Sequence, residues 1–401
     1  MTVVDRANLP RPPTLRGALR PTTLAEARDA VRDTPGALLF RGGGTKQGWG
    51  APPERVDAVV ETTGLDQLVE HSAGDMVAIV GAGMRLSALQ EALAPSGQWF
   101  AVDPPCVDEG VTLGGVFMTN DHGPRRLRYG AARDLVIGVT IVLADGTVAQ
   151  SGGRVVKNVA GYDLMRLYCG SLGTLGLVTE LIVRLHPLPE ASLTARIPGR
   201  MAALCRLVLA LLGSPVEPTA LDVAHGTLWV RLEGRPAGIA AQAEALRTLA
   251  ASHGLDVADR LGGPDETKVW RLLLAAHAGT EGETVARAAT LPDRLPQAAA
   301  ALAEAAAQAG VEARLASHAG LGLHTARFSG DPVAQVEGVR AWRRRIGALS
   351  GTVVLRRHVE GLGSPSDVFG PSPSAISVMR RVKAQLDPDR RCAPGRFVGG
   401  I

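Results

Sequence analysis

The chain has 401 residues, of which 46% are hydrophobic, with 48 glycines and 26 prolines, and this composition predicts a globular, turn-rich protein of two or three domains. Its net charge of +4 is small for this length and gives little support to nucleic-acid binding. The four cysteines, Cys106, Cys169, Cys205 and Cys392, form no C-x-x-C pair, which argues against a zinc ribbon, a disulfide framework and an iron–sulfur cluster held by this chain alone.

The N-terminal stretch, residues 1–21, contains arginines and prolines but no continuous apolar run. The most apolar later stretch, Leu204 to Leu212, is short and contains Arg206. We therefore expect no export signal and no membrane span. A reducing cytoplasm suits the widely separated cysteines.

The first predicted elements lead to a run of three glycines. Thr22 to Val31 begins with a hydroxyl residue and predicts a capped helix, and Ala37 to Phe40 predicts a short buried strand. The stretch "LLFRGGGTKQGWG", Leu38 to Gly50, follows neither the G-x-x-x-x-G-K-[ST] nor the G-x-G-x-x-G pattern. Its glycines allow successive N–H groups to point at one anion, whereas the plainer reading is a glycine-rich surface turn.

Further strands and helices follow up to about residue 190. We expect a strand at Asp75 to Val80, a helix at Leu86 to Leu93, a hairpin over 134–153 that turns at Ala144-Asp-Gly146, and a strand in "GLVTELIVRLHPLP". Two more glycine-dense turns lie between them, "DPPCVDEGVTLGGVFMTNDHGPRRLRYGAARD" and "KNVAGYDLMRLYCGSLGTLGLVTE".

Beyond residue 190 alanine-rich helices alternate with strands, which predicts an α+β cap domain of ferredoxin-like kind. The expected helices are 238–252, 296–308 and 336–349, and the expected strands are 221–233, 311–317, 323–328 and 352–357. A helix from about Ser374 precedes the tail "LDPDRRCAPGRFVGG". The predicted domains are residues 1–190, residues 191–370, and a segment of residues 371–401 that returns to the first domain.

In order, "RGGGTK", "TLGG" with a following G–R–YG segment, "KNVAGYDL" and "GSLGTLG" resemble the flavoproteins with the FAD-binding fold of p-cresol methylhydroxylase and vanillyl-alcohol oxidase. The stretch "GGRVVKNVAGYDLMRLYCGSLGTLGLVTEL" is most similar to the FAD-binding E subunit of bacterial glycolate oxidase. The resemblance covers about residues 20–190 and the tail. It implies an α+β fold, with a two-subdomain FAD-binding domain (PCMH type) and the cap.

The resemblance also implies how FAD is held. Arg41 to Gly48 would wrap the pyrophosphate through backbone N–H groups, and Thr112 to Gly115 would approach it from the other side. No histidine lies between Arg41 and Gly50, so we expect non-covalent FAD. The cofactor-binding residues that the resemblance implies are Arg41, Gly42, Gly43, Gly44, Thr45, Lys46, Gly48, Pro104, Thr112, Leu113, Gly114, Gly115, Thr119, Asn120, Gly123, Gly130, Gly173, Gly176, Leu177 and Val178.

Two departures from the family pattern remove polar contacts. Leu172 stands where many relatives have a glutamate, and Ala393 stands where many have an asparagine. The basic run Arg125 to Arg133 would attract the FAD phosphates or a carboxylate substrate, or else is a solvated face.

The catalytic half of the pattern is degenerate. Larger relatives carry "H-x-G-D-G-N-L-H" and "E-H-G" motifs that bind a divalent metal, whereas this chain has "SHAGLGLH" and "RRHVEGLG", with Leu321 where an aspartate is expected. His318, His324 and Glu360 could bind zinc, but a polar cluster without metal is favoured and no metal is expected. The candidate catalytic residues are His122, His318, His324 and His358.

The function that the resemblance implies is oxidation of glycolate or a similar 2-hydroxy acid to the 2-oxo acid by hydride transfer to FAD. The chain would act in a glycolate oxidase complex with a second FAD subunit and an iron–sulfur subunit, and would reach the inner membrane only through these partners. Two alternatives stay open. One is a non-catalytic subunit that keeps the flavin fold, and the other is a stand-alone FAD-dependent 2-hydroxy acid dehydrogenase.

Overall fold

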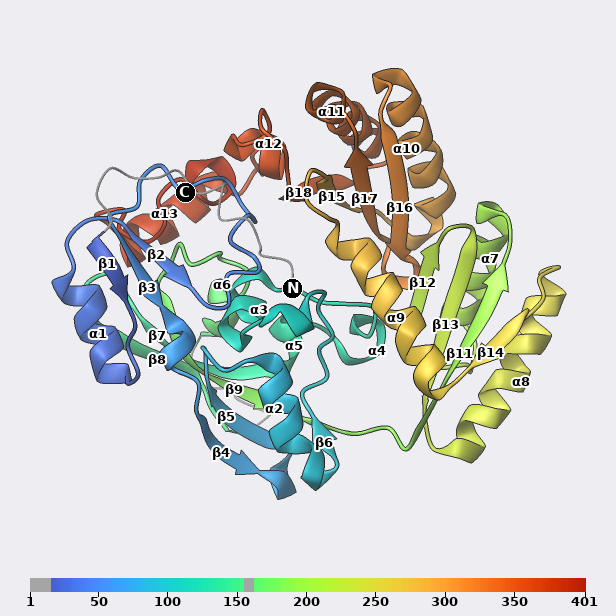
Figure 1. The fold of residues 1–401 in the computed structure, drawn as a ribbon, viewed down its shortest axis with the longest axis horizontal. Coiled ribbons are helices and arrows are strands. Elements are labelled where there is room, and N and C mark those ends of the chain that lie inside the picture. Colours follow the sequence, from blue (N-terminus) through green and yellow to red (C-terminus); the bar gives the residue numbers. More distant parts are fainter. Residues whose placement is uncertain (1–15, 155–161) are drawn as a thin grey trace.

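The computed structural model describes residues 16–154 and 162–401, which form two units connected after strand β9 (Leu177–Arg184) (Figure 1). We call residues 16–154 and 162–190, together with the tail 371–401, the N-terminal unit, and residues 191–370 the cap. The cap stands beside the N-terminal unit. None of the helices in the described residues has the length and apolarity needed to cross a bilayer.

A small parallel sheet begins the N-terminal unit, with strand order β1-β3-β2. Helix α1 (Leu24–Asp33) packs Ala27 and Val31 against it, and the Thr23 side chain caps this helix by accepting from the Glu26 amide. On the other face Leu39 and Val59 pack against Ala393 of the tail, so both faces of the sheet are covered. Strand β2 leads directly into the glycine run. The strands are β1 (Arg16–Leu19), β2 (Leu38–Arg41) and β3 (Ala58–Glu61).

The second sheet of this unit is antiparallel, with strand order β4-β5-β9-β7-β8. Helices α2 (Leu86–Leu93) and α3 (Leu113–Thr119) share with it one core, in which Phe100 and Phe117 are almost fully buried. Its other strands are β4 (Leu68–Ser72), β5 (Val77–Gly81), β7 (Val136–Val142) and β8 (Val148–Gly152). Shorter elements are β6 (Gln98–Trp99), β10 (His186–Pro187), α4 (Arg126–Tyr129), α5 (Ala132–Leu135) and α6 (Met165–Tyr168).

The cap is built on an eight-stranded antiparallel sheet of order β14-β11-β13-β12-β16-β17-β15-β18. Four helices cover one face and α9 packs on the other. The strands are β11 (Ala191–Pro198), β12 (Ala220–Ala224), β13 (Thr227–Gly234), β14 (Asp259–Leu261), β15 (Thr284–Ala289), β16 (Glu312–His318), β17 (Leu323–Ser329) and β18 (Thr352–Arg357). The helices are α7 (Met201–Leu212), α8 (Pro236–Ser252), α9 (Gly263–Ala278), α10 (Leu295–Ala309) and α11 (Pro332–Ala348).

Because side chains alternate between the two faces of a strand, several polar residues of the cap lie on the same face of its sheet. In β12, Leu221 and Val223 pack with α7 and α8, so Asp222 points to the opposite face, where Ala220 and Ala224 meet α9. The same alternation places Arg287, His318 and Arg356 on that face, because their strand neighbours belong to the helix-covered core. We call this side of the sheet, which meets the N-terminal unit, the junction face.

The prediction of a single strand over residues 221–233 of the cap is wrong. Residues 221–233 are two strands, β12 and β13, which turn at His225 and Gly226. Both turn residues have positive φ, of 51° and 69°, which the apolar pattern does not reveal. Helices α7 and α9 were also not predicted.

The tail packs against the start of the chain. Helix α12 (Pro365–Phe369) still contacts β18, and α13 (Ile376–Leu386) leads into the last residues. Across this return the Leu38 amide of β2 donates to the Arg391 carbonyl, and the Leu38 carbonyl accepts from the Ala393 amide. Chain segments more than 340 residues apart in sequence therefore meet beside the glycine run.

Candidate functional site

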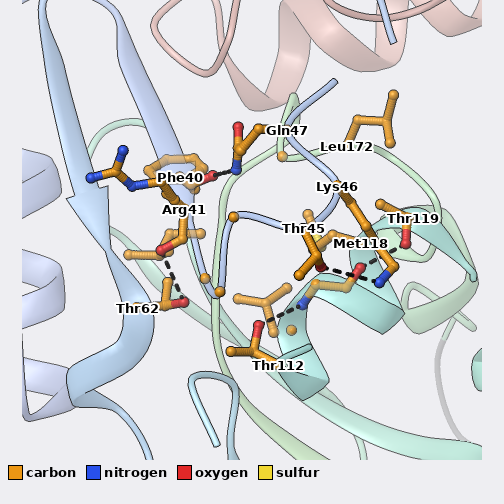
Figure 2. A pocket seen from close by; sticks show the side chains of 18 of the residues that line it. Phe40, Arg41, Thr45, Lys46, Gln47, Thr62, Thr112, Met118, Thr119 and Leu172 are labelled. Carbon is orange, nitrogen blue, oxygen red and sulfur yellow. Dashed lines mark hydrogen bonds between the residues drawn. The ribbon is translucent and has the colours of Figure 1, made fainter. Parts of the chain in front are cut away.

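A pocket enclosing about 640 Å³, its open mouth included, lies where the glycine run, the start of α3 and the turn before β9 converge (Figure 2). Its walls are mostly backbone and small side chains. The lining residues are Phe40, Arg41, Gly42, Gly43, Gly44, Thr45, Lys46, Gln47, Thr62, Thr112, Gly114, Gly115, Met118, Thr119, Leu172, Gly173, Gly176, Leu177, Val178 and Arg396.

The two loops at the base of the pocket pack closely, because the glycines leave room for the Gly110 carbonyl and the Thr112 side chain. A Cβ added at Gly43 would lie 1.9 Å from the Gly110 carbonyl oxygen, and one at Gly42 would lie 2.2 Å from Thr112 Oγ1. Gly44 has φ of +80°, and nothing lies within 4 Å of where its Cβ would be. Main-chain amides can therefore approach a ligand closely here, as a diphosphate requires. The cradle fits the pyrophosphate of FAD.

Most of the residues expected to bind the cofactor line this pocket. Others lie nearby but not in its wall. Gly123 sits against the Asp103 carbonyl, and Asn120 ends α3 in the left-handed conformation with φ of 47°. Expected residues outside the lining are Gly48, Pro104, Leu113, Asn120, Gly123 and Gly130.

Sequence reasoning missed several lining residues, among them Arg396 from the tail. Its guanidinium donates to the Gln47 carbonyl at 2.8 Å and to Gln47 Oε1 at 3.2 Å, so the tail holds the glycine run in place. Burial lowers the pKa of Arg396 to about 10. The signal was the arginine that follows "APG" in the tail. The missed residues are Phe40, Thr62, Met118, Leu172 and Arg396, whereas Gln47 lies within the predicted stretch Arg41 to Gly48.

The pocket connects to the cap through one ion-paired carboxylate. Lys46 lines the pocket, and its Nζ lies 3.3 Å from Asp121 Oδ2. Asp121 Oδ1 in turn accepts at 2.8 Å from Arg356 of β18, whose guanidinium stacks 3.8 Å from the ring centre of Trp49. Burial alone would raise the pKa of Asp121, but Lys46 and Arg356 hold it below its ordinary value.

The next residue, His122, contacts the cap directly. Arg287 NH1 of β15 lies 3.1 Å from His122 Nε2, and because arginine only donates, this ring nitrogen must accept. His122 Nδ1, Arg287 Nε and Arg287 NH2 are buried with no hydrogen-bond partner among the residues that the structure describes. Burial first, and then Arg287, lowers the pKa of His122 well below its ordinary value.

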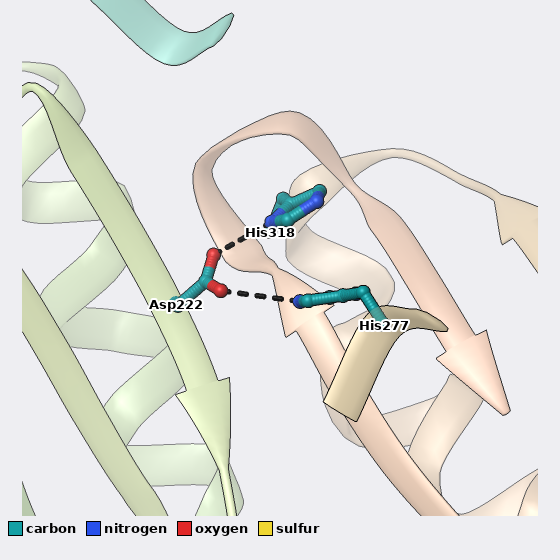
Figure 3. Close-up of side chains that lie close together, drawn as sticks. All are labelled: Asp222, His277 and His318. Carbon is teal, nitrogen blue, oxygen red and sulfur yellow. Dashed lines mark hydrogen bonds and ion pairs between the residues drawn. The ribbon is translucent and has the colours of Figure 1, made fainter. Parts of the chain in front are cut away.

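Beside them on the junction face is a triad of Asp222, His277 and His318 (Figure 3). Asp222 Oδ1 lies 2.7 Å from His318 Nδ1, and Oδ2 lies 3.1 Å from His277 Nε2. The two rings are stacked with centres 4.0 Å apart, and the His318 ring centre is 5.8 Å from that of His122. All three side chains are buried, and their ligand atoms lie within 4.8 Å of one another.

Burial shifts the ionisation of the triad. It lowers the pKa of His318 to about 3 and also lowers that of His277. Burial alone would raise the pKa of Asp222, but the two imidazoles hold it below its ordinary value. At neutral pH the triad is thus an ionised carboxylate between two neutral rings.

The other two expected histidines lie outside this triad. His324 points to the opposite, helix-covered face, where its ring nitrogens meet Thr290 Oγ1 at 2.9 Å and Ser317 Oγ at 2.8 Å. His358 follows β18 and bonds to the carbonyl of Val359. The structure thus brings together His122 and His318 but neither His324 nor His358. Their catalytic roles stay predictions.

Part of one expected motif lies outside the described residues. In "KNVAGYDL" the residues 157–161 are not described, so the structure neither places nor tests their contact with a cofactor. The following turn is described: Gly173 and Gly176 line the pocket with positive φ, of 79° and 146°.

Two family models match the chain. Residues 16–152 match the FAD binding domain, and residues 205–397 match the C-terminal domain of FAD linked oxidases. Alkyldihydroxyacetonephosphate synthase has the same fold, with a TM-score of 0.70 over 94% of this chain and 76% of its own, at 16% identity.

Three similar sequences have curated names. D-lactate dehydrogenase of Archaeoglobus fulgidus is 29% identical, covering 90% of this chain and 86% of the relative. Glycolate oxidase subunit GlcD of Bacillus subtilis is 28% identical over 90% of this chain and 83% of the relative. Glycolate oxidase subunit GlcE of Escherichia coli is 32% identical, covering 56% of this chain and 63% of the relative.

Proposed function

The chain carries the FAD binding domain and the C-terminal domain of the FAD linked oxidases, and from this premise we propose that it oxidises a small 2-hydroxy acid, glycolate or D-lactate, to the 2-oxo acid. It is an FAD-dependent oxidoreductase, and FAD bound in the pocket supplies the acceptor for a hydride. The glycine run, Thr112 and the turn before β9 would hold that cofactor.

The observation that carries the proposal is a set of buried donors without acceptors. Arg287 Nε, Arg287 NH2 and His122 Nδ1 have no partner within residues 16–154 and 162–401. Leaving such groups unpaired costs about 1–3 kcal/mol each, more when they are charged. A carboxylate accepts through two oxygens and matches the arginine fork, so a small carboxylic acid would satisfy these donors.

The donors are connected to the wall of the cofactor pocket by a short chain of contacts. One ion pair, from Lys46 to Asp121, and the peptide bond from Asp121 to His122 connect the pocket wall to Arg287. A carboxylate held by Arg287 would therefore place its adjacent hydroxyl carbon near the pocket. This arrangement suits oxidation of the carbon next to a carboxylate.

We also infer that the chain works as a flavin subunit of a glycolate oxidase complex that passes electrons to an iron–sulfur partner. The similarity to GlcE and GlcD supports this assembly. The four cysteines are free thiols, far apart along the chain, so a cluster would have to come from another subunit.

A second candidate is a flavin-binding subunit that does not turn over substrate. It is favoured by His324, which faces away from the junction, and by Leu321 in place of an acidic residue. The orphaned donors at Arg287 favour the enzyme instead.

The chain purified alone separates these functions. We expect a yellow protein with a flavin spectrum that bleaches without oxygen when glycolate or D-lactate is added. A yellow protein that neither acid bleaches, alone or with its partner subunits, would support the second candidate. A colourless protein after reconstitution with FAD would contradict both.

The substitution Arg287→Lys tests the carboxylate site. Lysine keeps the charge but loses the planar fork, and hydrogen bonds to charged groups contribute about 1.5–3 kcal/mol, so we expect KM for the acid to rise about 10- to 100-fold. Flavin content should not change. Arg314→Lys, at an exposed position of strand β16, which β17 separates from β15, is the matched control.

A further inference from the structure

The carboxylate of Asp222 fixes the tautomers of both histidines that face it. Its pKa is held below the ordinary range, so at neutral pH it can only accept hydrogen bonds. His318 Nδ1 and His277 Nε2 must therefore each carry a proton toward it. On His318 this leaves the lone pair on Nε2, the nitrogen on the far side of the ring.

The two rings differ in what their second nitrogen contacts. His277 Nδ1 lies 2.8 Å from Thr325 Oγ1, so His277 has partners on both nitrogens. His318 Nε2 is buried and has no partner in the described part of the chain. Of the pair, only His318 keeps an acceptor free for a ligand.

The free acceptor lies beside the donors described above. The ring of His318 is tilted by 54° to that of His122, with centres 5.8 Å apart, and Arg287 NH1 lies 3.1 Å from His122 Nε2. A 2-hydroxy acid has a carboxylate that needs donors and a hydroxyl proton that needs an acceptor. Arg287 and His122 offer the first, and His318 offers the second.

We propose that His318 Nε2 is the base that accepts the substrate's hydroxyl proton and that Asp222 is the positioning residue that keeps this nitrogen unprotonated. The inference rests on the proposed function. In the step, the O–H proton goes to His318 Nε2, the C–H bond breaks with its electron pair transferred as hydride to FAD, and the carbon–oxygen bond becomes the carbonyl of the 2-oxo acid. The acid is oxidised and FAD is reduced.

The electrostatics of the site make His318 a stronger base when substrate is present. Burial and the charge of Arg287 keep its pKa at about 3 in the free site. A bound carboxylate pairs with Arg287 and brings a negative charge to the same enclosure, which raises the pKa of His318. Asp222, 2.7 Å from Nδ1, stabilises the imidazolium that the step produces.

The critical variant is Asp222→Asn, which keeps volume and hydrogen bonding but can donate to His318 Nδ1. The ring proton then moves to Nε2, and the acceptor is lost. Since general base catalysis contributes about 10²- to 10⁴-fold, we expect reduction of the bound flavin by glycolate or D-lactate to slow by that factor. His318→Gln should slow it similarly. Flavin content and thermal unfolding, measured on each variant, verify that it folds.

A tautomer measurement tests the positioning role independently of turnover. Nitrogen NMR of protein with isotope-labelled histidine should show His318 protonated at Nδ1 in the wild type and at Nε2 in Asp222→Asn, with His318→Gln assigning the signal. A purely structural Asp222 would not move that proton. Asp259→Asn and His253→Gln make the same substitutions in the cap outside the triad and should leave both readouts unchanged.

The failures can be told apart. Wild-type rates of flavin reduction in His318→Gln overturn the base assignment while the proposed function stands. Wild-type rates in an Asp222→Asn protein whose His318 proton has moved to Nε2 do the same. A wild-type flavin that no 2-hydroxy acid bleaches contradicts the proposed function, and with it the base assignment. A wild-type His318 protonated at Nε2 overturns the base assignment whichever acid is the substrate.

Discussion

At the scale of single residues, the absence of side chains at three glycines lets two loops of the pocket pack together. Gly42 packs against the Thr112 side chain and Gly43 against the Gly110 carbonyl, so any side chain at either glycine would push the two loops apart. Gly44 faces open space at positive φ. The three glycines thus do different jobs: two permit loop contact, and one permits the turn.

Gly43→Val should abolish flavin retention. Its Cβ would lie 1.9 Å from a backbone oxygen that cannot move without moving the loop 107–111. The measurement is the ratio of flavin to protein absorbance after gel filtration. Gly74→Val, at a position with nothing within 4 Å of the added Cβ, is the control and should keep its flavin. A fully yellow Gly43→Val would show that this contact is not needed.

His324 differs from His318 because both of its ring nitrogens have hydrogen-bond partners, and both partners lie within the helix-covered core. Burial lowers its pKa from 6.5 to about 4, so between these pH values the unfolded chain binds a proton that the folded chain does not. The free energy of unfolding therefore falls as pH decreases through this window, by about 1.4 kcal/mol per pH unit for one such group.

Replacing this histidine should flatten that dependence. We expect the melting temperature of His324→Gln to fall less steeply from pH 6.5 to 4 than that of the wild type, even if it is lower at pH 7. His225→Gln, at the β12–β13 turn, is the control. Identical slopes in wild type and His324→Gln would contradict a depressed His324 pKa.

At the scale of elements, helix α13 joins the tail to the N-terminal unit through a buried lysine. Lys383 Nζ donates to Asp387 Oδ2 and to the Thr174 carbonyl, both at 2.6 Å, and to the Cys392 carbonyl at 2.9 Å. Thr174 belongs to the turn before β9, which lines the pocket. One ammonium group thus fixes three segments.

Lys383→Met should destabilise the protein by about 3–5 kcal/mol, because it leaves the fully buried Asp387 without its counter-ion. Chemical unfolding followed by circular dichroism measures the change, and looser flavin binding should accompany it. Lys268→Met, on the exposed side of α9, should change stability by less than about 0.5 kcal/mol. Equal stabilities for the two variants would contradict the role of Lys383.

The elements that the sequence predicts well are those with local signals. Helix 86–93 and strand 352–357 have the predicted bounds, since apolar spacing defines both. The β12–β13 hairpin was missed because a His-Gly turn between two apolar runs has no strong signature. The pocket was predicted from glycine patterns, whereas Arg396 was not, since its place depends on where the tail returns.

The triad of Asp222, His277 and His318 also depends on tertiary structure and could not be predicted from the sequence. His318 and His324 are close in sequence, yet pairing of Ser317 with His324 and of His318 with Leu323 puts the two histidines on opposite faces of the sheet. Asp222 and His277 come from a different strand and a helix, 96 and 41 residues before His318. Tertiary structure alone brings them together, so no motif identifies the triad.

At the scale of the whole molecule, the candidate active site forms only when the cap packs against the N-terminal unit. His122 comes from the N-terminal unit, and Arg287 and His318 come from the cap. Buried ion pairs cross the junction: Arg356 to Asp121, and Arg125 to Glu233, whose carboxylate is 1% exposed. The guanidinium of Arg125 also stacks 4.7 Å from the ring centre of Trp99.

Arg125→Met should therefore impair turnover without loss of flavin. In this variant Glu233 still has its ion pair with Arg231, 3.2 Å away. The substitution therefore removes one hydrogen-bonded charge pair across the junction, which we expect to weaken the packing of the cap by about 2 kcal/mol. All residues that line the cofactor pocket belong to the N-terminal unit, so flavin content should stay at the wild-type level. We expect kcat/KM for the 2-hydroxy acid to fall, because the cap no longer holds Arg287 and His318 firmly against His122.

Arg128→Met is the matched control, because Arg128 makes an ion pair with Glu217 across the same junction but both side chains are at least half exposed. Exposed pairs contribute about 0–1 kcal/mol, so this variant should retain most of its kcat/KM. If both variants lost activity equally, net charge and not the buried contact would set the position of the cap. If Arg125→Met lost its flavin, the pocket would depend on the cap, contrary to the lining that the structure gives it.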